Sequence, residues 1–327
     1  MKTIAFFNNK GGVGKTSLVY HLACMYTDLG LTVVAADLDP QANLTTMFLD
    51  EDDLESLWPT GEGGRRTVLG PILPLLEGEG GIEDPHIENV RDVGLLAGDL
   101  DLSSFEDELS QQWPLCLEGK RRAFRVIGAF HEVLARASRA TQAHLVLIDV
   151  GPNLGAINRA ALIAADQVVI PLAPDLFSLK GLQNLGPRLR DWNEGWRARL
   201  TKKPDRMELP KGRMTPLGYV VMQHAVRLDR PVKAYQKWMA RIPPTYREAV
   251  LDEDAASVAL DADPHCLATL KHYRSLMPLA REARKPMFEL TPADGAIGGH
   301  AQAVQTCYRD FRALAGAIAE RAGLALP

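Results

Sequence analysis

The chain has 327 residues, of which 46% are hydrophobic and 24% are charged, and its formal net charge is −4. This composition is ordinary for one large or two modest folded domains, and it excludes a disordered chain, a collagen-like structure and a small disulfide-stapled protein. The four cysteines lie far apart, which argues against a zinc site, an iron–sulfur cluster or a disulfide framework. Every apolar run is shorter than the roughly 20 residues of a membrane-spanning helix, or is interrupted by Asp166. We expect a cytoplasmic protein with no cleaved signal and no stable membrane insertion.

Strand-like and helix-like patterns alternate along the chain. A β-rich run at residues 3–8 leads into a helical stripe at residues 15–29, and Gly30 is a typical residue to end that helix. Further strand-like runs lie at residues 31–36, 93–97, 145–150, 168–172 and 217–222. Because these runs lack polar alternation, they predict strands buried on both faces, as in a parallel sheet. The predicted fold class is α/β, a doubly wound, mostly parallel sheet flanked by helices.

No linker is long or biased enough to divide the chain, so we predict a single domain over residues 1–327 that carries insertions. A C-terminal helix is predicted at residues 299–323. Its apolar stripe is accompanied by few cations, which favours a helix packed on the sheet over one that lies on a membrane. The stripe consists of Val304, Phe311, Leu314, Ile318 and Ala322.

Residues 8–16, with the sequence NNKGGVGKT, form a glycine-rich segment between the first strand and the first helix. A strand that runs through such a loop into a helix offers backbone N–H groups and the positive end of a helix dipole to an anion. Lys15 would reach the β- and γ-phosphates of a nucleotide there, and the Thr16 hydroxyl would bind Mg²⁺. The predicted nucleotide-binding residues are Lys10, Gly11, Gly12, Val13, Gly14, Lys15, Thr16 and Ser17.

Asn9 departs from the usual phosphate-loop pattern, which has glycine at this position. The alternative interpretation is a glycine-rich turn with an incidental lysine. The strand before the loop, the helix after it and the Gly-Lys-Thr core disfavour that alternative.

Carboxylates follow two of the other predicted strands. Asp149 ends an apolar run, which is the position of a Mg²⁺-holding carboxylate in phosphate-loop enzymes. An aspartate that caps the next turn is the alternative. Asp37 and Asp39 precede Pro40, where aspartate is also common for turn chemistry alone, so the residues by themselves leave the role of this pair open.

Several segments together resemble the ParA/MinD family of ATPases, whose deviant phosphate loop has a second lysine, here Lys10. The first switch of that family is written DxDPQGN, and its later motifs IDCPPSLG and EYYALEGL. Ala42 and Gly151 depart from these patterns, which have glycine and proline there. The segments that carry the resemblance are residues 10–16 (KGGVGKT), 37–45 (DLDPQANLT), 95–109 (LLAGDLDLSSFEDEL), 148–155 (IDVGPNLG), 175–182 (DLFSLKGL), 285–286 (KP) and 294–296 (DGA).

The resemblance implies a P-loop ATPase with a three-layer α/β/α fold and with ATP and Mg²⁺ as cofactors. It implies that Thr16, Asp37 and Asp149 hold the metal ion or lie near it. Asp39 would position the attacking water, and Lys15 would neutralise charge on the phosphates. Segments at approximately residues 110–125, 200–213 and 249–276 fit the family least and are interpreted as insertions.

Lys10 receives a distinct role from the resemblance. In this family the second lysine reaches the phosphates that are bound by a sister subunit, so that ATP bridges a homodimer. The implied catalytic residues are Lys10, Lys15 and Asp39. ATP binding then acts as a dimerisation switch that depends on the γ-phosphate.

Charge is unevenly distributed along the chain. Residues 186–247 hold fifteen Lys or Arg against five Asp or Glu, whereas residues 50–118 hold three Arg against eighteen Asp or Glu. The resemblance implies nonspecific binding of double-stranded DNA through a late basic region. A solvated charged face is the alternative, and the residues leave both open. The candidate DNA contacts are Arg227, Arg230, Lys233, Lys237, Arg241 and Arg247.

The leading functional hypothesis is an ATPase that positions or segregates plasmid or chromosomal DNA, or another cargo. It would be nucleoid-associated, and its hydrolysis would be stimulated by a ParB-like partner or a cargo adaptor. One alternative is a metabolic or metal-handling ATPase of the same fold, and another is a MinD-like membrane-associated ATPase. A module that binds ATP without turning it over is the third.

Overall fold

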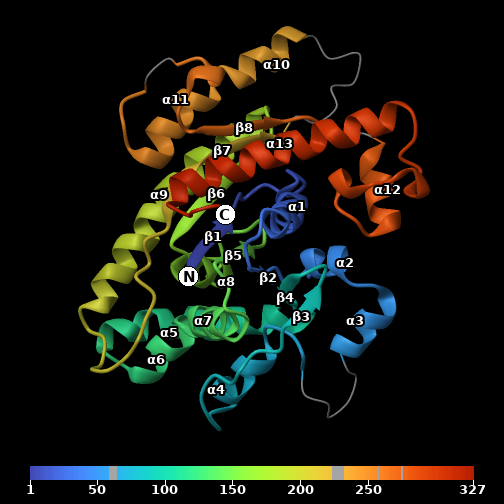
Figure 1. The fold of residues 1–327 in the computed structure, drawn as a ribbon. Helices are drawn as coiled ribbons and strands as arrows, with labels where there is room; N and C mark the ends of the chain where they lie inside the picture. Colours follow the sequence, from blue (N-terminus) through green and yellow to red (C-terminus); the bar gives the residue numbers. More distant parts are fainter. Residues whose placement is uncertain (59–64, 223–231, 256–257, 274) are drawn as a thin grey trace.

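An eight-stranded β-sheet forms the centre of the molecule (Figure 1). The computed structural model describes residues 1–58, 65–222, 232–255, 258–273 and 275–327. The strands are β1 (Lys2–Phe6), β2 (Val33–Asp37), β3 (Glu88–Val90), β4 (Val93–Leu96), β5 (Leu145–Asp149), β6 (Gln167–Leu172), β7 (Thr215–Met222) and β8 (Cys266–Leu270). Their spatial order is β3-β4-β2-β5-β1-β6-β7-β8, and every neighbouring pair is parallel except β3 with β4.

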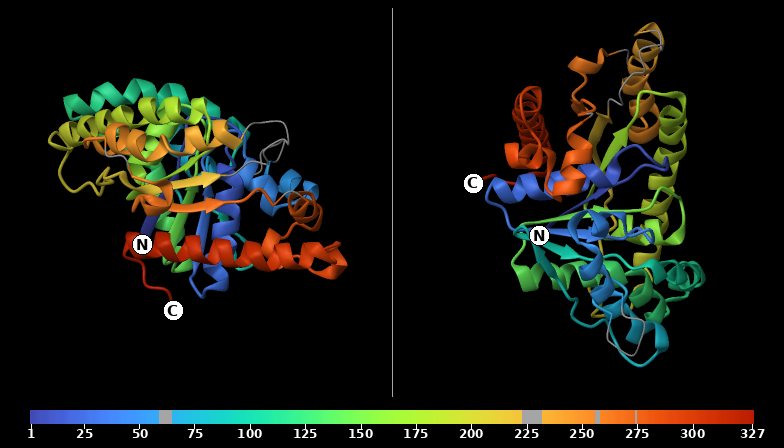
Figure 2. Two further views of the ribbon diagram at one scale, coloured as in Figure 1. Left: turned by 90° about the horizontal axis from the view of Figure 1, so that it is seen from above. Right: turned by 90° about the vertical axis from the view of Figure 1, so that its right-hand side faces the viewer.

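Helices cover both faces of this sheet (Figure 2). On the described residues they are α1 (Lys15–Asp28), α2 (Asn43–Phe48), α3 (Glu51–Leu57), α4 (Leu73–Glu77), α5 (Phe105–Leu115), α6 (Arg121–Ile127), α7 (Ala129–Thr141), α8 (Ala156–Ala164), α9 (Leu176–Leu200), α10 (Val232–Met239), α11 (Ile242–Tyr246), α12 (Leu276–Ala283) and α13 (Gly299–Ala322). The predicted α/β fold class, with a doubly wound and mostly parallel sheet, is confirmed.

Six of the eight strands coincide with the predicted runs to within about two residues. The sequence did not predict β3 and β8, which form the two edges of the sheet. β3 has only three residues and no buried side chain, and in β8 only Leu267 and Leu270 are buried. β8 lies inside the segment 249–276 that was interpreted as an insertion, so part of that segment belongs to the central sheet.

The sheet separates two hydrophobic cores, because successive side chains of a strand point to opposite faces. In β1, Ala5 packs with the core under α5–α9, while Ile4 and Phe6 pack with the core under α1 and α13. Phe311, Leu314 and Ile318 of the predicted C-terminal stripe are buried in this second core. α13 therefore packs on the protein itself, and none of the described helices is long and apolar enough to cross a membrane.

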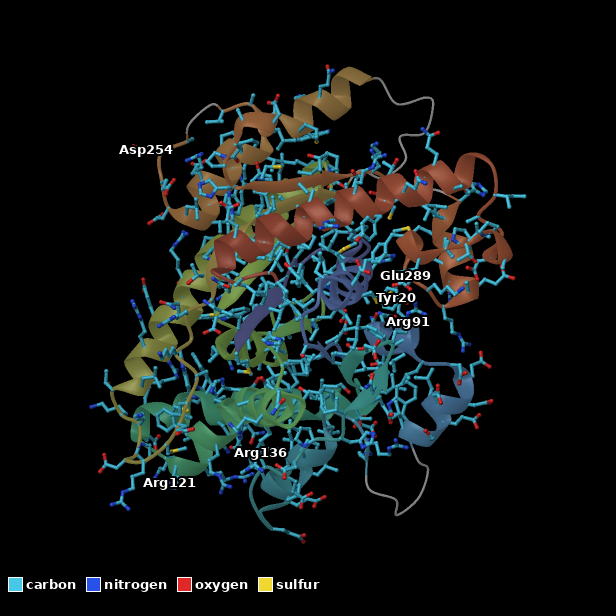
Figure 3. All side chains as sticks on the ribbon, viewed as in Figure 1. Tyr20, Arg91, Arg121, Arg136, Asp254 and Glu289 are labelled. Carbon is cyan, nitrogen blue, oxygen red and sulfur yellow. The ribbon has the colours of Figure 1, made fainter. Side chains whose placement is uncertain are left out.

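The edge hairpin β3–β4 is tied to the C-terminal part of the chain. Its turn residues Arg91 and Asp92 both have positive φ (55° and 61°), which suits the tight turns of two-residue hairpins. The Arg91 guanidinium pairs with the carboxylate of Glu289, and both lie beside Tyr20 of α1 (Figure 3). This contact joins the sheet edge, α1 and the short 3₁₀ helix Met287–Glu289 around one face of α1.

His21 fixes α1 to the same 3₁₀ helix from inside the core. Its Nδ1 donates to the Ser17 carbonyl oxygen at 2.7 Å, and its Nε2 accepts from the Met287 N–H at 3.1 Å, so the ring is neutral. The ring stacks on Phe311 with 5.0 Å between centroids. Burial lowers the pKa of His21 to about 4, because the charged form would lose its hydration there.

We expect the His21 contribution to stability to fall between pH 6.5 and pH 4, because the unfolded chain protonates His21 in this window and the folded chain does not. The His21 contribution amounts to about 3 kcal/mol over the window. Urea unfolding of the wild type and of His21→Gln at both pH values measures it, since glutamine does not titrate. Equal pH slopes for the two proteins would contradict the assignment.

Candidate nucleotide-binding site

The glycine-rich loop joins β1 to α1 at the carboxyl end of the sheet. Gly12 and Gly14 have φ of 73° and 86°, a left-handed conformation that side chains with a Cβ rarely adopt. Asn8 organises the loop start, since its Oδ1 accepts from the Lys10 N–H at 2.9 Å. Its Nδ2 donates to the Pro171 carbonyl oxygen at 2.5 Å, which anchors the loop to β6. The Asn8 side chain thus holds the start of the loop, next to Asn9, where the usual pattern has glycine.

The loop forms one wall of an open cleft of about 1230 Å³. All eight residues predicted to bind nucleotide line it, together with Asp39 from the segment after β2 and residues of α12. The Lys15 side chain is only 7% exposed, and its ammonium lies 4.0 Å from a carboxylate oxygen of Asp149, at the carboxyl end of β5. The structure therefore brings the loop and the predicted strand-end carboxylate together.

Asp149 is buried at the end of β5. Among the described residues neither of its carboxylate oxygens accepts a hydrogen bond that satisfies normal geometry. Burial raises the pKa of Asp149, and the nearby Lys15 ammonium acts in the opposite direction. An unsatisfied buried carboxylate beside the Thr16 hydroxyl fits a divalent cation, because such a cation takes oxygen ligands and compensates the buried charge.

A site of this kind is consistent with Mg²⁺ rather than with a metal held by protein alone. No group of three or more His, Cys, Asp or Glu with metal-binding geometry occurs in the described part of the chain. Mg²⁺ is usually bound by one or two carboxylates together with waters and phosphates. The metal roles of Thr16, Asp37 and Asp149 stay predictions.

Asp37 and Asp39 have different surroundings. Asp37 lies opposite Asp149 in the parallel register, and its Oδ2 accepts from both the backbone N–H and the hydroxyl of Thr45, each at 2.8 Å. Burial and the Asp149 charge raise its pKa. Asp39 lines the cleft, and its Oδ1 accepts from the Gln41 N–H at 3.1 Å. The geometry makes Asp37 the anchor of α2 and leaves Asp39 facing the cleft.

The two positions at which the chain departs from the family motifs, Ala42 and Gly151, both have a distinctive geometry. Ala42 has φ of 50°, a left-handed conformation that glycine adopts without strain, which accounts for the glycine of the motif. Gly151 faces Asp39, since a Cβ at position 151 would lie 3.2 Å from the Asp39 Oδ1. Gly151 thereby leaves room for the carboxylate that borders the cleft.

Lys10 is held by an acidic partner that the sequence did not reveal. Its ammonium pairs with the carboxylate of Asp175, which also caps α9 by accepting from the Ser178 N–H at 2.9 Å. Burial would raise the pKa of Asp175, but the Lys10 and Ser178 contacts hold it below its ordinary value. Phe177 follows with its side chain 71% exposed, 5.9 Å from the Lys10 Nζ. The only sequence signal for Asp175 was its position three residues before Ser178, which is typical of an aspartate that caps the start of a helix.

The predicted basic stretch is only partly within the described structure. Arg227 and Arg230 lie outside the described residues, and Lys233 lies in α10, where its side chain is not described. The Nζ of Lys237 lies 5.7 Å, and the Cζ of Arg241 5.1 Å, from the Trp238 ring centroid.

Lys237 and Arg241 are exposed at the surface. Arg247 instead pairs with Asp263 at 3.2 Å and with Glu253 at 3.3 Å, and its side chain is only 16% exposed. This geometry speaks against a DNA contact for Arg247.

Comparison with known proteins identifies the family. Residues 1–202 match the AAA_31 model, described as an AAA domain. The chain belongs to this family, the ParA/MinD family of P-loop ATPases. The predicted resemblance to the ParA/MinD family is confirmed.

Two relatives carry partition names. The chromosome partitioning protein ParA of Caulobacter vibrioides is 31% identical over 186 residues, which cover 57% of this chain and 61% of that protein. The chromosome-partitioning ATPase Soj of Thermus thermophilus is 31% identical over 202 residues, which cover 61% of this chain and 66% of that protein. The match thus spans somewhat less than two thirds of these relatives.

Solved structures resemble the fold over more of its length. Protein DIP2308 of Corynebacterium diphtheriae has a TM-score of 0.64 and 28% identity, with coverage of 87% of this chain and 97% of that one. A variant of McdA from Cyanothece, in complex with ATP, has a TM-score of 0.63 and 16% identity, with coverage of 99% and 97%. At this identity the McdA likeness concerns the fold alone.

We expect Thr45→Val to lower the free energy of unfolding by about 1–3 kcal/mol, because a buried acceptor and a buried donor lose partners. The Thr45 hydroxyl donates to Asp37 and accepts from the Gly98 N–H at 2.7 Å. Thr45→Ser is the matched control, since it keeps the hydroxyl. Chemical denaturation of both variants measures the effect, and a loss of equal size in the serine variant would refute this account.

Proposed function

We propose that this protein is a ParA-like partition ATPase that forms an ATP-bridged homodimer, binds DNA without sequence preference and releases it on hydrolysis. The observation that carries the proposal is the phosphate loop with two lysines. Lys15 lies inside the cleft beside Asp149, whereas Lys10 is 28% exposed at the rim. Membership of the ParA/MinD family and the partition names of two relatives support it.

Each of the predicted site residues has its own role in the proposed phosphoryl transfer. ATP and Mg²⁺ are the proposed cofactors, and bound Mg²⁺ supplies charge neutralisation at the phosphates. Thr16 and Asp149 would hold the ion, and Asp37 would lie near it, beside Asp149. Lys15 and the loop N–H groups would bind the phosphates, and Asp39 would orient a water. The half-buried contact between Lys10 and Asp175 at the rim is the part that would change on dimer formation.

The proposed DNA face combines Lys237 and Arg241 around Trp238 with Arg227, Arg230 and Lys233 of the same stretch. Cations that contact phosphates give affinity without sequence information, which suits a retention role on the nucleoid. A ParB-like protein or a cargo adaptor would stimulate turnover. We also propose that the whole chain forms one domain.

Duplex DNA retention with ATP, ADP and no nucleotide tests the function. We expect affinity with ATP to exceed that with ADP by at least about tenfold, since the dimer presents two basic faces at once. Lys15→Ala should abolish the difference because it removes the phosphate contact. Fluorescence anisotropy with a labelled duplex at fixed salt measures it. Equal affinity in all three states would overturn the switch.

The Lys10–Asp175 pair yields a sharper test of the dimer. Lys10 must leave Asp175 before it reaches phosphates of a second subunit, so Asp175→Asn should tighten ATP-dependent dimerisation by roughly threefold, the worth of a half-exposed ion pair. Asparagine keeps the helix cap. Lys10→Ala should impair dimerisation while sparing ATP binding by the monomer. Sedimentation with a non-hydrolysable ATP analogue measures both, and a Lys10→Ala protein that dimerises normally would count against the sandwich.

A further inference from the structure

A second pocket, of about 590 Å³, opens away from the nucleotide cleft. It lies between the C-terminal half of α9, residues 211–216 and the π-helical turn Arg247–Leu251. In Figure 1 the yellow segment that follows α9 runs back along this helix to β7. The pocket is at the amino end of β7, whereas the carboxyl end of β7 brings Met222 to Gly14 of the phosphate loop. Because β7 has eight residues, the two sites are about 20 Å apart.

The segment 201–214, whose last residues line the pocket, is held in place by three side chains. The Trp196 indole N–H donates to the Pro210 carbonyl oxygen at 2.8 Å, and Asn193 Nδ2 donates to the Gly212 carbonyl oxygen at 2.5 Å. Arg121 of α6, labelled in Figure 3, donates to the Asp205 carbonyl oxygen at 3.2 Å. The pocket is therefore preformed, which lowers the entropy that a ligand must lose on binding.

Irregular backbone gathers around this pocket. Met214 has φ of 46°, and β7 bulges at Leu217, which has no partner in the register with β6. The opposite wall is the π-helical turn, which approaches α9 so closely that a Cβ at Gly186 would lie 1.8 Å from the Ala249 carbonyl oxygen. Strained turns, bulges and π-helical turns are concentrated at functional sites, because strain must be repaid by a selected use.

The rim of the pocket carries unneutralised positive charge. Arg197, Lys211 and Arg213 are exposed there, and within the described part of the chain no ion pair or hydrogen bond engages their side chains. Arg190 is already committed, since its guanidinium donates to the Ala249 carbonyl oxygen at 2.7 Å. Glu194 is the single acidic residue among the described residues that line the pocket.

Leu189, Met214, Pro216 and Val250 are the apolar residues among those that line the pocket. We propose that this pocket docks an acidic peptide segment of a partner protein. One apolar side chain of the peptide contacts these residues, and flanking carboxylates pair with the rim cations, as in the recognition of acidic motifs by arginine clusters. A DNA backbone presents phosphates but no apolar group that would fill a hollow of this shape.

The inference that the bound peptide belongs to a cargo rests on the proposed partition function. The inference that the pocket binds an acidic peptide does not. The pocket lies at the other end of β7 from the rim where Lys10 would face a second subunit. A bound peptide therefore leaves the nucleotide cleft and the proposed dimer face open. Two of the rim cations, Lys211 and Arg213, lie in the segment 200–213, which fits the family motifs least.

Selection from a displayed library of random peptides, of roughly twelve residues each, tests the proposal against the immobilised full chain. Lys211→Ala/Arg213→Ala serves as the counter-selected variant. We expect enriched peptides to contain several Asp or Glu around a large apolar residue. A labelled peptide of that sequence should then bind the double variant at least about tenfold more weakly than the wild type by anisotropy.

Lys202→Ala/Lys203→Ala is the matched control, since it removes the same charge from two residues that follow α9 and do not line the pocket, and it should bind the peptide normally. Enrichment of basic peptides, equal binding by both double variants, or no enrichment over the counter-selected variant would each overturn the proposal. A Lys211→Ala/Arg213→Ala protein that lost duplex DNA instead would assign these cations to DNA. ATP-dependent DNA retention by the wild type is scored separately, so failure of the pocket and failure of the partition function are distinguishable.

Discussion

The burial of ionisable groups at the carboxyl ends of β2 and β5 is the constraint on which the rest of the structure depends. Parallel pairing of β2 with β5 sets Asp37 beside Asp149, and both carboxylates are fully buried. Two adjacent buried carboxylates repel each other and lose hydration, so each needs compensation. Asp37 finds it in the two donors of Thr45, whereas Asp149 has Lys15 at 4.0 Å. The remaining deficit at Asp149 is what a bound cation would remove.

The same constraint shapes the segments around the cleft. Because Thr45 must reach Asp37, the chain between them is a short loop that turns back, with Ala42 in a left-handed conformation. That loop carries Asp39 to the cleft wall. Gly98 packs against Asp37, since a Cβ at position 98 would lie 2.9 Å from the Asp37 carboxyl carbon. A charge change at the phosphates would therefore be felt by the segment after β2 through one buried carboxylate.

Local patterns in the sequence predicted the central strands and the phosphate loop, because buried runs and glycine loops are encoded by adjacent residues. They did not predict β8, because this edge strand has only five residues and only two of them are buried. The partners of Lys10 and Arg247 were also beyond reach. Asp175 is separated from Lys10 by 165 positions, and Asp263 meets Arg247 only because β8 adds to the sheet. Such pairs depend on topology, which no local spacing contains.

The positions of the two sites on β7 bear on how nucleotide state and partner binding could be linked. β7 lies inside the sheet between β6 and β8, and its central residues Tyr219, Val220 and Val221 are fully buried. A second arrangement of the centre of β7, which one site could select and the other could sense, would have to displace the close-packed strands on both sides. Coupling between sites requires such a bistable element. A peptide bound in the basic pocket should therefore leave the rate of ATP hydrolysis unchanged. Such a peptide would attach a cargo, whereas a different partner would stimulate hydrolysis.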